Sequence, residues 1–294
     1  MRSHIAIIGA GNLGQALKKL LDKHEVHLWD KVADKVPNQK PLADVVTPSQ
    51  VVFLAVPSSV VREVLQEIKP FLGKKAIVVT LAKGIEPGTL ETIDQLLLNS
   101  LPKSQPCAHL SGPMLAAEIQ KGKHAAAVVG AYSRSTFTKL KKIFSETPIN
   151  LAYSRDMRGV AVAGVLKNIY TLPLGIAAGL ELGNNTIGWL AYCALNEMQQ
   201  VMPMLGGAKK TLLSVAGIGD FIATATSPLS MNYRAGSEIA KTGGPVTISE
   251  GLVALPSILT LLGPKVQKLP LLHALSQIVV HRHDARTTLT NLLV

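Results

Sequence analysis

The segment Ile5-Ala6-Ile7-Ile8-Gly9-Ala10-Gly11-Asn12-Leu13-Gly14-Gln15-Ala16-Leu17 decides the fold, because it joins a short apolar run to a glycine loop and a helical pattern. In such a strand–loop–helix unit, the first glycine permits a tight turn, the second lets the backbone approach a pyrophosphate, and the third lets helix and strand pack closely. Unpaired amides at the helix N-terminus would then face the phosphates. We therefore predict a dinucleotide-binding loop built from Gly9, Gly11, Asn12, Leu13 and Gly14.

A second β-rich run, residues 25–29, leads into an acidic residue, Asp30, at the spacing of about 20 residues that is typical of dinucleotide-binding units. A carboxylate here would accept hydrogen bonds from the adenine-ribose hydroxyls of NAD and would repel the extra phosphate of NADP. The alternative is that Asp30 caps the turn while Lys31 and Lys35 receive a 2′-phosphate. NAD is the expected cofactor, and NADP is the alternative.

Short β-rich runs alternate with helical patterns in the first half of the chain, which indicates βαβ units on a doubly wound, mainly parallel sheet. The expected strands are residues 5–8, 25–29, 51–56, 76–81, 125–129 and 149–153, and the expected helices are residues 15–21, 60–68 and 90–97. From about Arg158 onward, helical periodicity replaces the β runs. We therefore expect an α/β N-terminal Rossmann domain over residues 1–155 and an all-α C-terminal domain over residues 156–294.

The chain is strongly basic. It has 294 residues and a net charge of +11, from 30 Lys and Arg against 19 Asp and Glu. A positive field raises the local concentration of anionic ligands, which fits a small phosphorylated substrate. Nucleic acid fits poorly, because the lysine pairs are scattered and only 4% of the residues are aromatic.

Several features favour a cytoplasmic protein without a metal site. Cys107 and Cys193 are far apart and lack metal-binding spacing, so we expect neither a disulfide nor a zinc site. The first residues run directly into a β pattern without the features of a signal peptide. Residues 160–180 form the longest apolar run, but charged and helix-breaking residues interrupt it, which favours a buried core helix over a membrane span. Residues 281–284 are expected at a solvated helix end.

Lys167 is the most informative single residue, because it lies inside this apolar run. Desolvation penalises the charged form of a buried lysine, so the pKa of Lys167 should fall toward the range useful for acid and base chemistry. Gly159 and Ala163 precede it on the same helix face and would leave room for a ligand beside the ammonium group. The alternative is a lysine whose stem lies along an apolar surface with its charge in water.

Residues 216–224 carry a second candidate cluster. Two glycines precede Asp220 and permit a tight turn into a helix, on which Asp220 and Thr224 share one face. A carboxylate and a hydroxyl that point together suit a lysine partner and a polyol substrate. Asp220 can also serve as a helix cap, and the two roles are compatible.

These motifs resemble, in order and spacing, those of the NAD(P)-dependent glycerol-3-phosphate dehydrogenases over nearly the whole chain. The matching segments are residues 9–14, 54–58, 83–86, 111–113 with Ala116 and Glu118, 166–168, 183–186, 217–220 and 250–251. The resemblance implies hydride exchange between a nicotinamide and C2 of dihydroxyacetone phosphate or glycerol 3-phosphate. It also implies a homodimer formed through the helical domain.

The resemblance further implies roles for individual residues. Lys167, Lys83 and Asp220 would be catalytic, with Lys167 as the proton donor or acceptor and Lys83 in contact with substrate and cofactor. Further cofactor contacts would come from Pro57, Ala116 and Glu250, and further substrate contacts from Asn168, Thr224, Ser230, Asn232 and Arg234.

One departure from the family pattern affects the substrate. Where the family has an arginine that holds the substrate phosphate, this chain reads Ser230-Met231-Asn232-Tyr233-Arg234. Truncating one partner of a desolvated charge pair costs about 2–5 kcal/mol. Either Arg234 replaces the missing cation or the site takes another substrate. Met114 in place of serine and Leu13 in place of an aromatic residue are milder changes.

Two other functions are therefore kept as alternatives. Met231 favours a related lysine-dependent dehydrogenase of another small hydroxy acid or polyol phosphate. A catalytically weak NAD-binding sensor is the second alternative, but such a protein would not need Lys83, Lys167 and Asp220.

Overall fold

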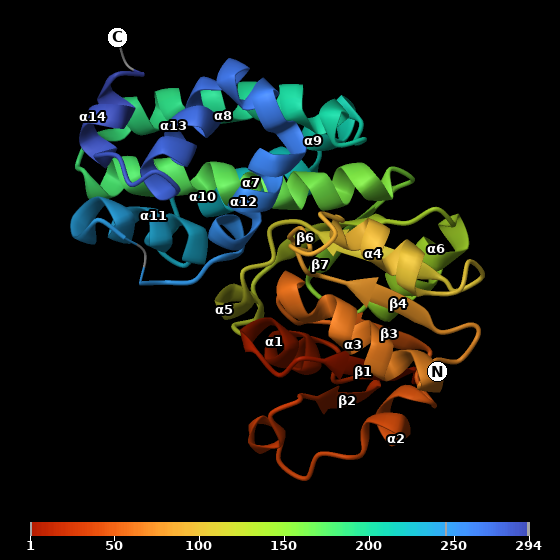
Figure 1. Ribbon diagram of the computed structural model, residues 1–294. Coiled ribbons are helices and arrows are strands. Elements are labelled where there is room, and N and C mark those ends of the chain that lie inside the picture. The colour runs from red at the N-terminus through yellow and green to blue at the C-terminus, as the bar shows by residue number, and fades with distance from the viewer. Residues whose placement is uncertain (1, 245, 293–294) are drawn as a thin grey trace.

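The computed structural model describes residues 2–244 and 246–292, in which a seven-stranded sheet is followed by an all-helical region (Figure 1). The strands are β1 (His4–Ile8), β2 (Glu25–Trp29), β3 (Val51–Leu54), β4 (Ile77–Thr80), β5 (Cys107–Ser111), β6 (Ala125–Gly130) and β7 (Ile149–Ser154). Their order is β2-β1-β3-β4-β5-β6-β7, and only β5 and β6 pair antiparallel. The predicted Rossmann-like sheet, mainly parallel and followed by helices, is confirmed.

Each face of the sheet is covered by its own helices. Alternate residues of β1 point to opposite faces: Ile5 and Ile7 enter one apolar core, and Ala6 and Ile8 enter another. The first core includes residues of α1 (Asn12–Leu20), α5 (Ala116–Ile119) and α6 (Arg134–Ile143). The second includes residues of α2 (Leu42–Val46), α3 (Val61–Ile68) and α4 (Ile93–Ser100). Strands that are apolar on both sides are typical of sheets covered on both faces.

Several elements of this region differ from the predictions: α2, α5 and α6 were not predicted as helices, and β5 and α4 also differ. β5 was not predicted, because His109 stands in the middle of its apolar alternation and Ser111 ends it. Both side chains are buried on the face of the sheet that α7 (Met157–Gly179) covers, and burial lowers the pKa of His109 to about 4, so its ring is neutral. α4 begins at Ile93 rather than at residue 90, because Thr92 and Gln95 form a capping box there.

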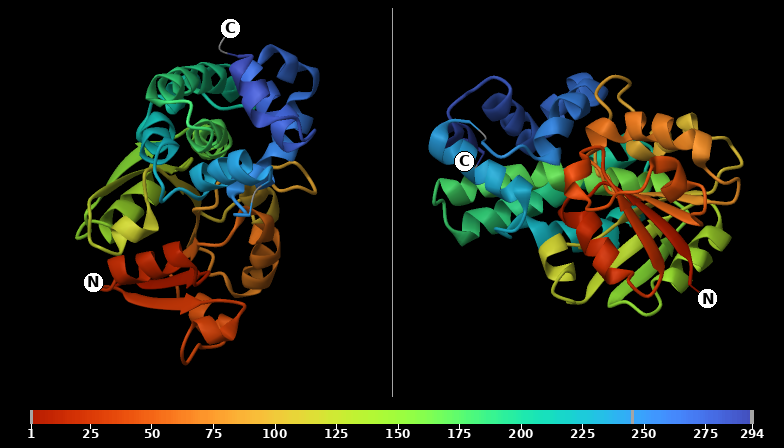
Figure 2. Two further views of the ribbon diagram at one scale, coloured as in Figure 1. Left: turned by 90° about the vertical axis from the view of Figure 1, so that its left-hand side faces the viewer. Right: turned by 90° about the horizontal axis from the view of Figure 1, so that it is seen from below.

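The helical region is built around α7. The other helices are α8 (Asn184–Met204), α9 (Lys209–Leu212), α10 (Asp220–Ala225), α11 (Met231–Thr242), α12 (Glu250–Leu262), α13 (Pro270–Val279) and α14 (Ala285–Thr290). Figure 2 (left) shows α7 nearly end-on with these helices around it. α11 packs very closely on α7, since a Cβ on Gly236 would lie 3.0 Å from Cα of Gly175.

α7 is long and apolar enough to cross a membrane by length and composition, but its apolar window is entirely buried within the protein. The prediction of a core helix for residues 160–180 is therefore confirmed. The segment 281–284 is exposed between α13 and α14, and the side chain of Asp284 accepts a hydrogen bond from the amide of Thr287. This agrees with the predicted solvated helix end.

The sheet ends with β7 at Ser154, and α7 begins at Met157. The division into domains over residues 1–155 and 156–294 stays a prediction. Residues 1 and 293–294, at the outer ends of these two ranges, lie outside the described residues.

Candidate active site

The glycine loop follows β1 and leads into α1. Gly9 has φ +107°, and a Cβ there would lie 2.5 Å from the carbonyl oxygen of Ala55. A Cβ on Gly14 would overlap the carbonyl group of Gly9, whereas a Cβ on Gly11 would meet no atom within 4 Å. Gly9 and Gly14 are thus required by packing, and Gly11 borders open space at the N-terminus of α1. This geometry fits the predicted approach of a pyrophosphate to the loop.

Asp30, at the end of β2, is bound to the backbone of the same region. Its carboxylate accepts hydrogen bonds from the amides of Ala10 at 2.8 Å and Val32 at 2.9 Å, and Lys35 lies 3.4 Å away. Burial alone would raise the pKa of Asp30, but these amide hydrogen bonds and Lys35 lower it below its usual value. Asp30 therefore caps the turn and also borders a pocket, and its contact with the adenine ribose stays a prediction.

That pocket, of about 200 Å³, lies between the end of β2 and α3. Trp29, Pro57, Val60 and Val64 form its apolar wall, and Asp30 lies at its rim. An apolar slot beside a carboxylate, next to the glycine loop, fits an adenine and its ribose.

Three charged side chains from distant parts of the sequence meet beyond the carboxyl end of β4. Nζ of Lys83 lies 2.5 Å from Oδ2 of Asp220 and donates a hydrogen bond to the carbonyl oxygen of Gly112 at 3.1 Å. Nζ of Lys167 lies 3.3 Å from Oδ1 of the same carboxylate. One carboxylate therefore contacts two ammonium groups, at the same edge of the sheet as the glycine loop.

Lys167 is 5% exposed in the middle of α7. Burial lowers the pKa of Lys167 to about 8; Asp220 opposes this shift, and the charge of Lys83 adds to it. Lys167 can therefore exist in both protonation states close to neutral pH. The pKa of Lys167 is lowered, as the sequence predicted for a buried lysine. The alternative, in which its charge lies in water, does not agree with a side chain that is buried.

The prediction that Gly159 leaves room for a ligand beside Lys167 is wrong, and Gly164 is the glycine that borders the stem of Lys83. A Cβ on Gly164 would lie 3.0 Å from Cγ of Lys83 and 3.2 Å from Oγ of Ser111. Gly159 instead lies near the start of α7, where a Cβ would come 3.0 Å from Cβ of Thr211. Its distance along the helix, two turns from Lys167, explains the error.

Asn168 connects the lysines to α11 and α12. Its side-chain amide donates to the carbonyl oxygen of Lys83 at 3.1 Å, and its oxygen accepts from the side chain of Asn232 at 2.8 Å. Asn232 in turn accepts from the amide of Gly251 at 2.8 Å. The start of α11 is therefore separated from Lys167 by one hydrogen-bonded pair of asparagines.

Of the remaining predicted substrate residues, Thr224 and Ser230 are buried, whereas Arg234 is exposed. Thr224 is buried and donates its hydroxyl to the carbonyl oxygen of Asp220 at 2.8 Å. Ser230 caps α11, and its hydroxyl accepts from the amide of Tyr233 at 3.3 Å. Met231 is 50% exposed at the first position of α11, and Arg234 is exposed one turn later. The cation that the family pattern places at residue 231 is thus replaced by an apolar side chain.

Glu250 and Ser58 join the helical region to the sheet. The carboxylate of Glu250 accepts from the amide of Ser58 at 3.0 Å and from its hydroxyl at 2.5 Å. Burial raises the pKa of Glu250, and the two hydrogen bonds from Ser58 oppose that shift. Glu250 therefore binds the residue directly after Pro57, beside the candidate cofactor site. The role of Ser58 as its partner was missed by the sequence reasoning.

Ala116 begins α5, a short helix that packs on α1. Gln120, at the end of α5, donates to the carbonyl oxygen of Asn12 at 3.3 Å, and its own carbonyl oxygen accepts from Lys19. α5 is therefore fixed beside the glycine loop. In the described part of the chain, no three His, Cys, Asp or Glu side chains form a cluster that could hold a metal ion.

A dinucleotide-type loop and a lysine–aspartate–lysine cluster at the same sheet edge define an NAD(P)-dependent oxidoreductase. Comparison with known proteins gives the family. Residues 31–137 match the family model described as NAD-dependent glycerol-3-phosphate dehydrogenase N-terminus, and residues 156–290 match the model for the C-terminus. The chain belongs to the NAD-dependent glycerol-3-phosphate dehydrogenase family.

Individual relatives agree with this assignment. The glycerol-3-phosphate dehydrogenase (NAD(P)+) of Clostridium tetani is 33% identical, with 81% of this chain and 74% of the relative covered. That of Citrifermentans bemidjiense is 29% identical, with 100% and 97% covered. The crystal structure of the enzyme from Coxiella burnetii matches 99% of both chains with 25% identity and a TM-score of 0.88.

The contrast between Gly11 and Gly14 gives a test of the loop. Gly11 has φ −68° and open space around its Cβ position, so Gly11→Ala should leave the midpoint of thermal unfolding unchanged. It should raise the Kd for NADH about tenfold or more, because the backbone can no longer approach the pyrophosphate. Gly14→Ala is the control and should lower the unfolding midpoint. Calorimetry and NADH fluorescence titration measure both; undiminished NADH affinity in Gly11→Ala would place the cofactor elsewhere.

Proposed function

We propose that this chain interconverts glycerol 3-phosphate and dihydroxyacetone phosphate, with Lys167 as the general acid and base and NAD as its cofactor. Membership of the family supports this reaction. The observation that supports the proposed chemistry is the contact of both Lys83 and Lys167 with Asp220. This cluster lies at the carboxyl edge of the sheet, where ligands of open α/β sheets bind.

In the reducing direction, the ammonium form of Lys167 polarises the substrate carbonyl and donates its proton to the oxygen on which negative charge develops. In the oxidising direction, its neutral amine accepts the proton of the substrate hydroxyl. The nicotinamide, when bound, accepts or supplies the hydride. Asp220 orients both lysines, and Lys83 remains as a second cation beside the developing charge.

The pKa of Lys167 gives opposite pH dependences for the two directions. Because that pKa is about 8, reduction should decline and oxidation should rise as pH increases through this value. Lys167→Met keeps the apolar stem and removes the ionisable group, so kcat for reduction of dihydroxyacetone phosphate should fall about 100- to 10,000-fold. NADH oxidation measures the rates, and unchanged NADH binding serves as the folding control. A variant with more than a tenth of the original kcat would exclude Lys167 as the acid.

We propose that the start of α11 binds the substrate phosphate and that Arg234 contributes the cation. The hydrogen bond from Asn232 to Asn168 supports this position, because it joins the start of α11 to the residue next to Lys167. The amides at the N-terminus of α11 favour an anion, since the hydroxyl of Ser230 accepts from the amide of Tyr233 and leaves those of Met231 and Asn232 for a ligand.

The missing arginine at residue 231 can be restored. Met231→Arg should lower the KM for dihydroxyacetone phosphate about tenfold or more, because a guanidinium would pair with the phosphate. It should leave the KM for unphosphorylated dihydroxyacetone unchanged, and Met231→Gln is the uncharged control. Steady-state kinetics measures the KM of each variant for both ketones. An equal effect on both substrates would mean that residue 231 does not face the phosphate.

The two alternatives make different predictions. A dehydrogenase of another hydroxy acid or polyol phosphate would prefer a different member of a panel of carbonyl substrates. An NAD-binding sensor would bind NADH without turnover of any of them. The intact lysine–aspartate–lysine contact supports an enzyme over a sensor.

We also propose that the chain forms a homodimer through α8. The outer side of this helix carries exposed Trp189, Tyr192 and Met204, and its one charged residue, Glu197, is buried. Aromatic residues and methionine without charges are typical of interface cores. A helix surface without exposed charges also lets two chains of net charge +11 meet with less repulsion.

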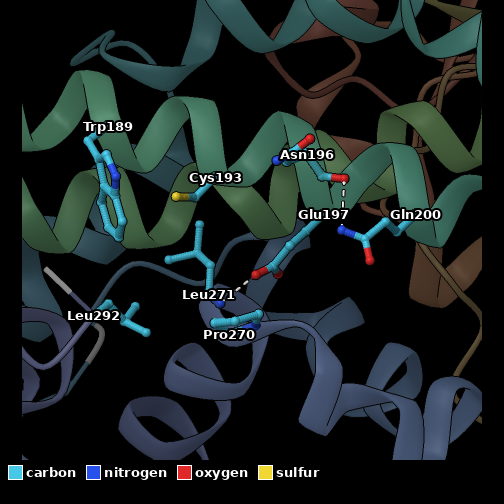
Figure 3. A pocket seen from close by; sticks show the side chains of 8 residues that line it. All are labelled: Trp189, Cys193, Asn196, Glu197, Gln200, Pro270, Leu271 and Leu292. Atoms are coloured by element: carbon cyan, nitrogen blue, oxygen red, sulfur yellow. Dashed lines mark hydrogen bonds between the residues drawn. The ribbon is translucent and has the colours of Figure 1, made fainter. Parts of the chain in front are cut away.

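A hollow of about 270 Å³ lies beside this surface, between α8 and α13. Figure 3 shows the side chains that line it. Trp189 and Cys193 line one side of it, and Pro270 and Leu271 line the other. Glu197 closes its inner end and accepts hydrogen bonds from the amides of Leu271 and Leu272. An apolar hollow next to protruding aromatic residues suits a contact between two copies of the same face.

Charge at this face should separate the protomers. Tyr192→Arg would place like charges across a two-fold contact and should convert a dimer to a monomer, whereas Leu98→Arg, at an exposed position of α4, should not. Light scattering after size-exclusion chromatography measures the mass of each variant. A dimer that persists in Tyr192→Arg would show that another surface forms the contact.

A cytoplasmic location is also proposed. It is supported by Cys107 and Cys193, which are both free thiols in this structure. Cell fractionation tests it.

A further inference from the structure

The pocket of about 200 Å³ between the end of β2 and α3 is lined by two carboxylates that do not belong to any of the sequence motifs. Glu63 and Glu67 lie one turn apart on α3 and line this pocket together with Asp30. Both contact the same lysine: Nζ of Lys31 is hydrogen-bonded to Glu63 and lies 3.5 Å from Oε1 of Glu67. The lysine that directly follows Asp30 is thus held by α3.

The second lysine of this region also has a carboxylate partner. Nζ of Lys35 lies 3.4 Å from Oδ1 of Asp30. The charged residues that line the pocket are the acids Asp30, Glu63 and Glu67 and the bases Lys31 and Lys35, so the local sum is −1. This pocket is negative in a chain whose net charge is +11.

We infer that Glu63 and Glu67 determine cofactor specificity by neutralising Lys31 and so exclude NADP from the pocket. The inference rests on the proposed function, because it requires a dinucleotide to bind here. A 2′-phosphate brings about two negative charges to the end of β2, where it needs a free cation. In this chain Asp30 repels it, and both nearby lysines already contact carboxylates. NAD lacks this phosphate and meets no such penalty.

The ion pairs that hold Lys31 are exposed, which makes them easy to remove. The side chains of Lys31 and Glu63 are 66% and 50% exposed, and that of Glu67 is 33% exposed. Exposed pairs contribute little to folding stability. Substitution of both glutamates should therefore change the electrostatics of the pocket without unfolding the protein.

The experiment compares NADH and NADPH binding in four proteins: the original chain, Glu63→Gln/Glu67→Gln, Lys31→Ala, and the triple variant. Trp29 lines the pocket, so quenching of its fluorescence reports binding without turnover. The glutamine pair should lower the Kd for NADPH about tenfold and change that for NADH less than about twofold. Lys31→Ala alone should not lower the Kd for NADPH, because it frees no cation and leaves Glu63 and Glu67 without their partner. Adding Lys31→Ala to the glutamine pair should abolish the gain.

Asp22→Asn/Glu146→Gln is the matched control, because it removes the same number of exposed acids beyond the far end of α1. An equal gain for NADPH in this control would overturn the inference, since net charge alone would then explain the effect. A gain that survives in the triple variant would also overturn it, because Lys31 would not be the cation released.

The outcome can be separated from that of the proposed function. If dihydroxyacetone phosphate is reduced with NADH but the glutamine pair leaves the ratio of the two Kd values unchanged, the inference alone fails. If the ratio shifts as expected but no reduction occurs with dihydroxyacetone phosphate, the proposed reaction fails and the assignment of Glu63 and Glu67 holds.

Discussion

The contact of Asp220 with both Lys83 and Lys167 is the interaction on which the candidate site depends. Two ammonium groups in a largely buried space repel each other and lose hydration, so they require a nearby carboxylate. Asp220 is 1% exposed and supplies one oxygen to each lysine. The remaining effect of burial lowers the pKa of Lys167 to about 8, which suits the general acid and base that we propose it to be. Asp220 therefore both balances the buried charge of the two lysines and helps to set the pKa of Lys167.

This contact requires α7 to lie against the carboxyl edge of the sheet. Lys83 follows β4, whereas Lys167 belongs to α7 and Asp220 to α10, so the cluster forms only when both regions are packed together. Gly164 allows this packing, because a side chain there would collide with the stem of Lys83. The hydrogen bonds from Ser58 to Glu250 add a second connection between the regions, beside the candidate cofactor site. The contacts of Asp220 with the two lysines and of Glu250 with Ser58 thus hold the helical region against the sheet, beside both candidate binding sites.

Local patterns in the sequence predicted much of this arrangement, but they did not predict pairs of residues that are distant in the sequence. The glycine loop, Asp30 and the burial of Lys167 were predictable, because each depends on a short segment with its own periodicity. The pairing of Glu250 with Ser58 and of Lys31 with Glu63 was not, because no local pattern records which side chains meet across the fold. β5 was missed for a different reason, since a buried histidine without a charge resembles a polar interruption in sequence. The resemblance to a family supplied the roles of Lys83 and Asp220, which spacing alone left open.

The pKa of Lys167 tests the central claim most directly. Nuclear magnetic resonance of protein with 13C-labelled lysine side chains follows each ammonium through a pH titration, and the signal absent from Lys167→Met identifies this residue. We predict a pKa of about 8 for Lys167 in the original chain and a lower value in Asp220→Asn, because the carboxylate opposes the effect of burial. A pKa near the usual 10.5, unchanged by Asp220→Asn, would contradict a desolvated lysine held by Asp220.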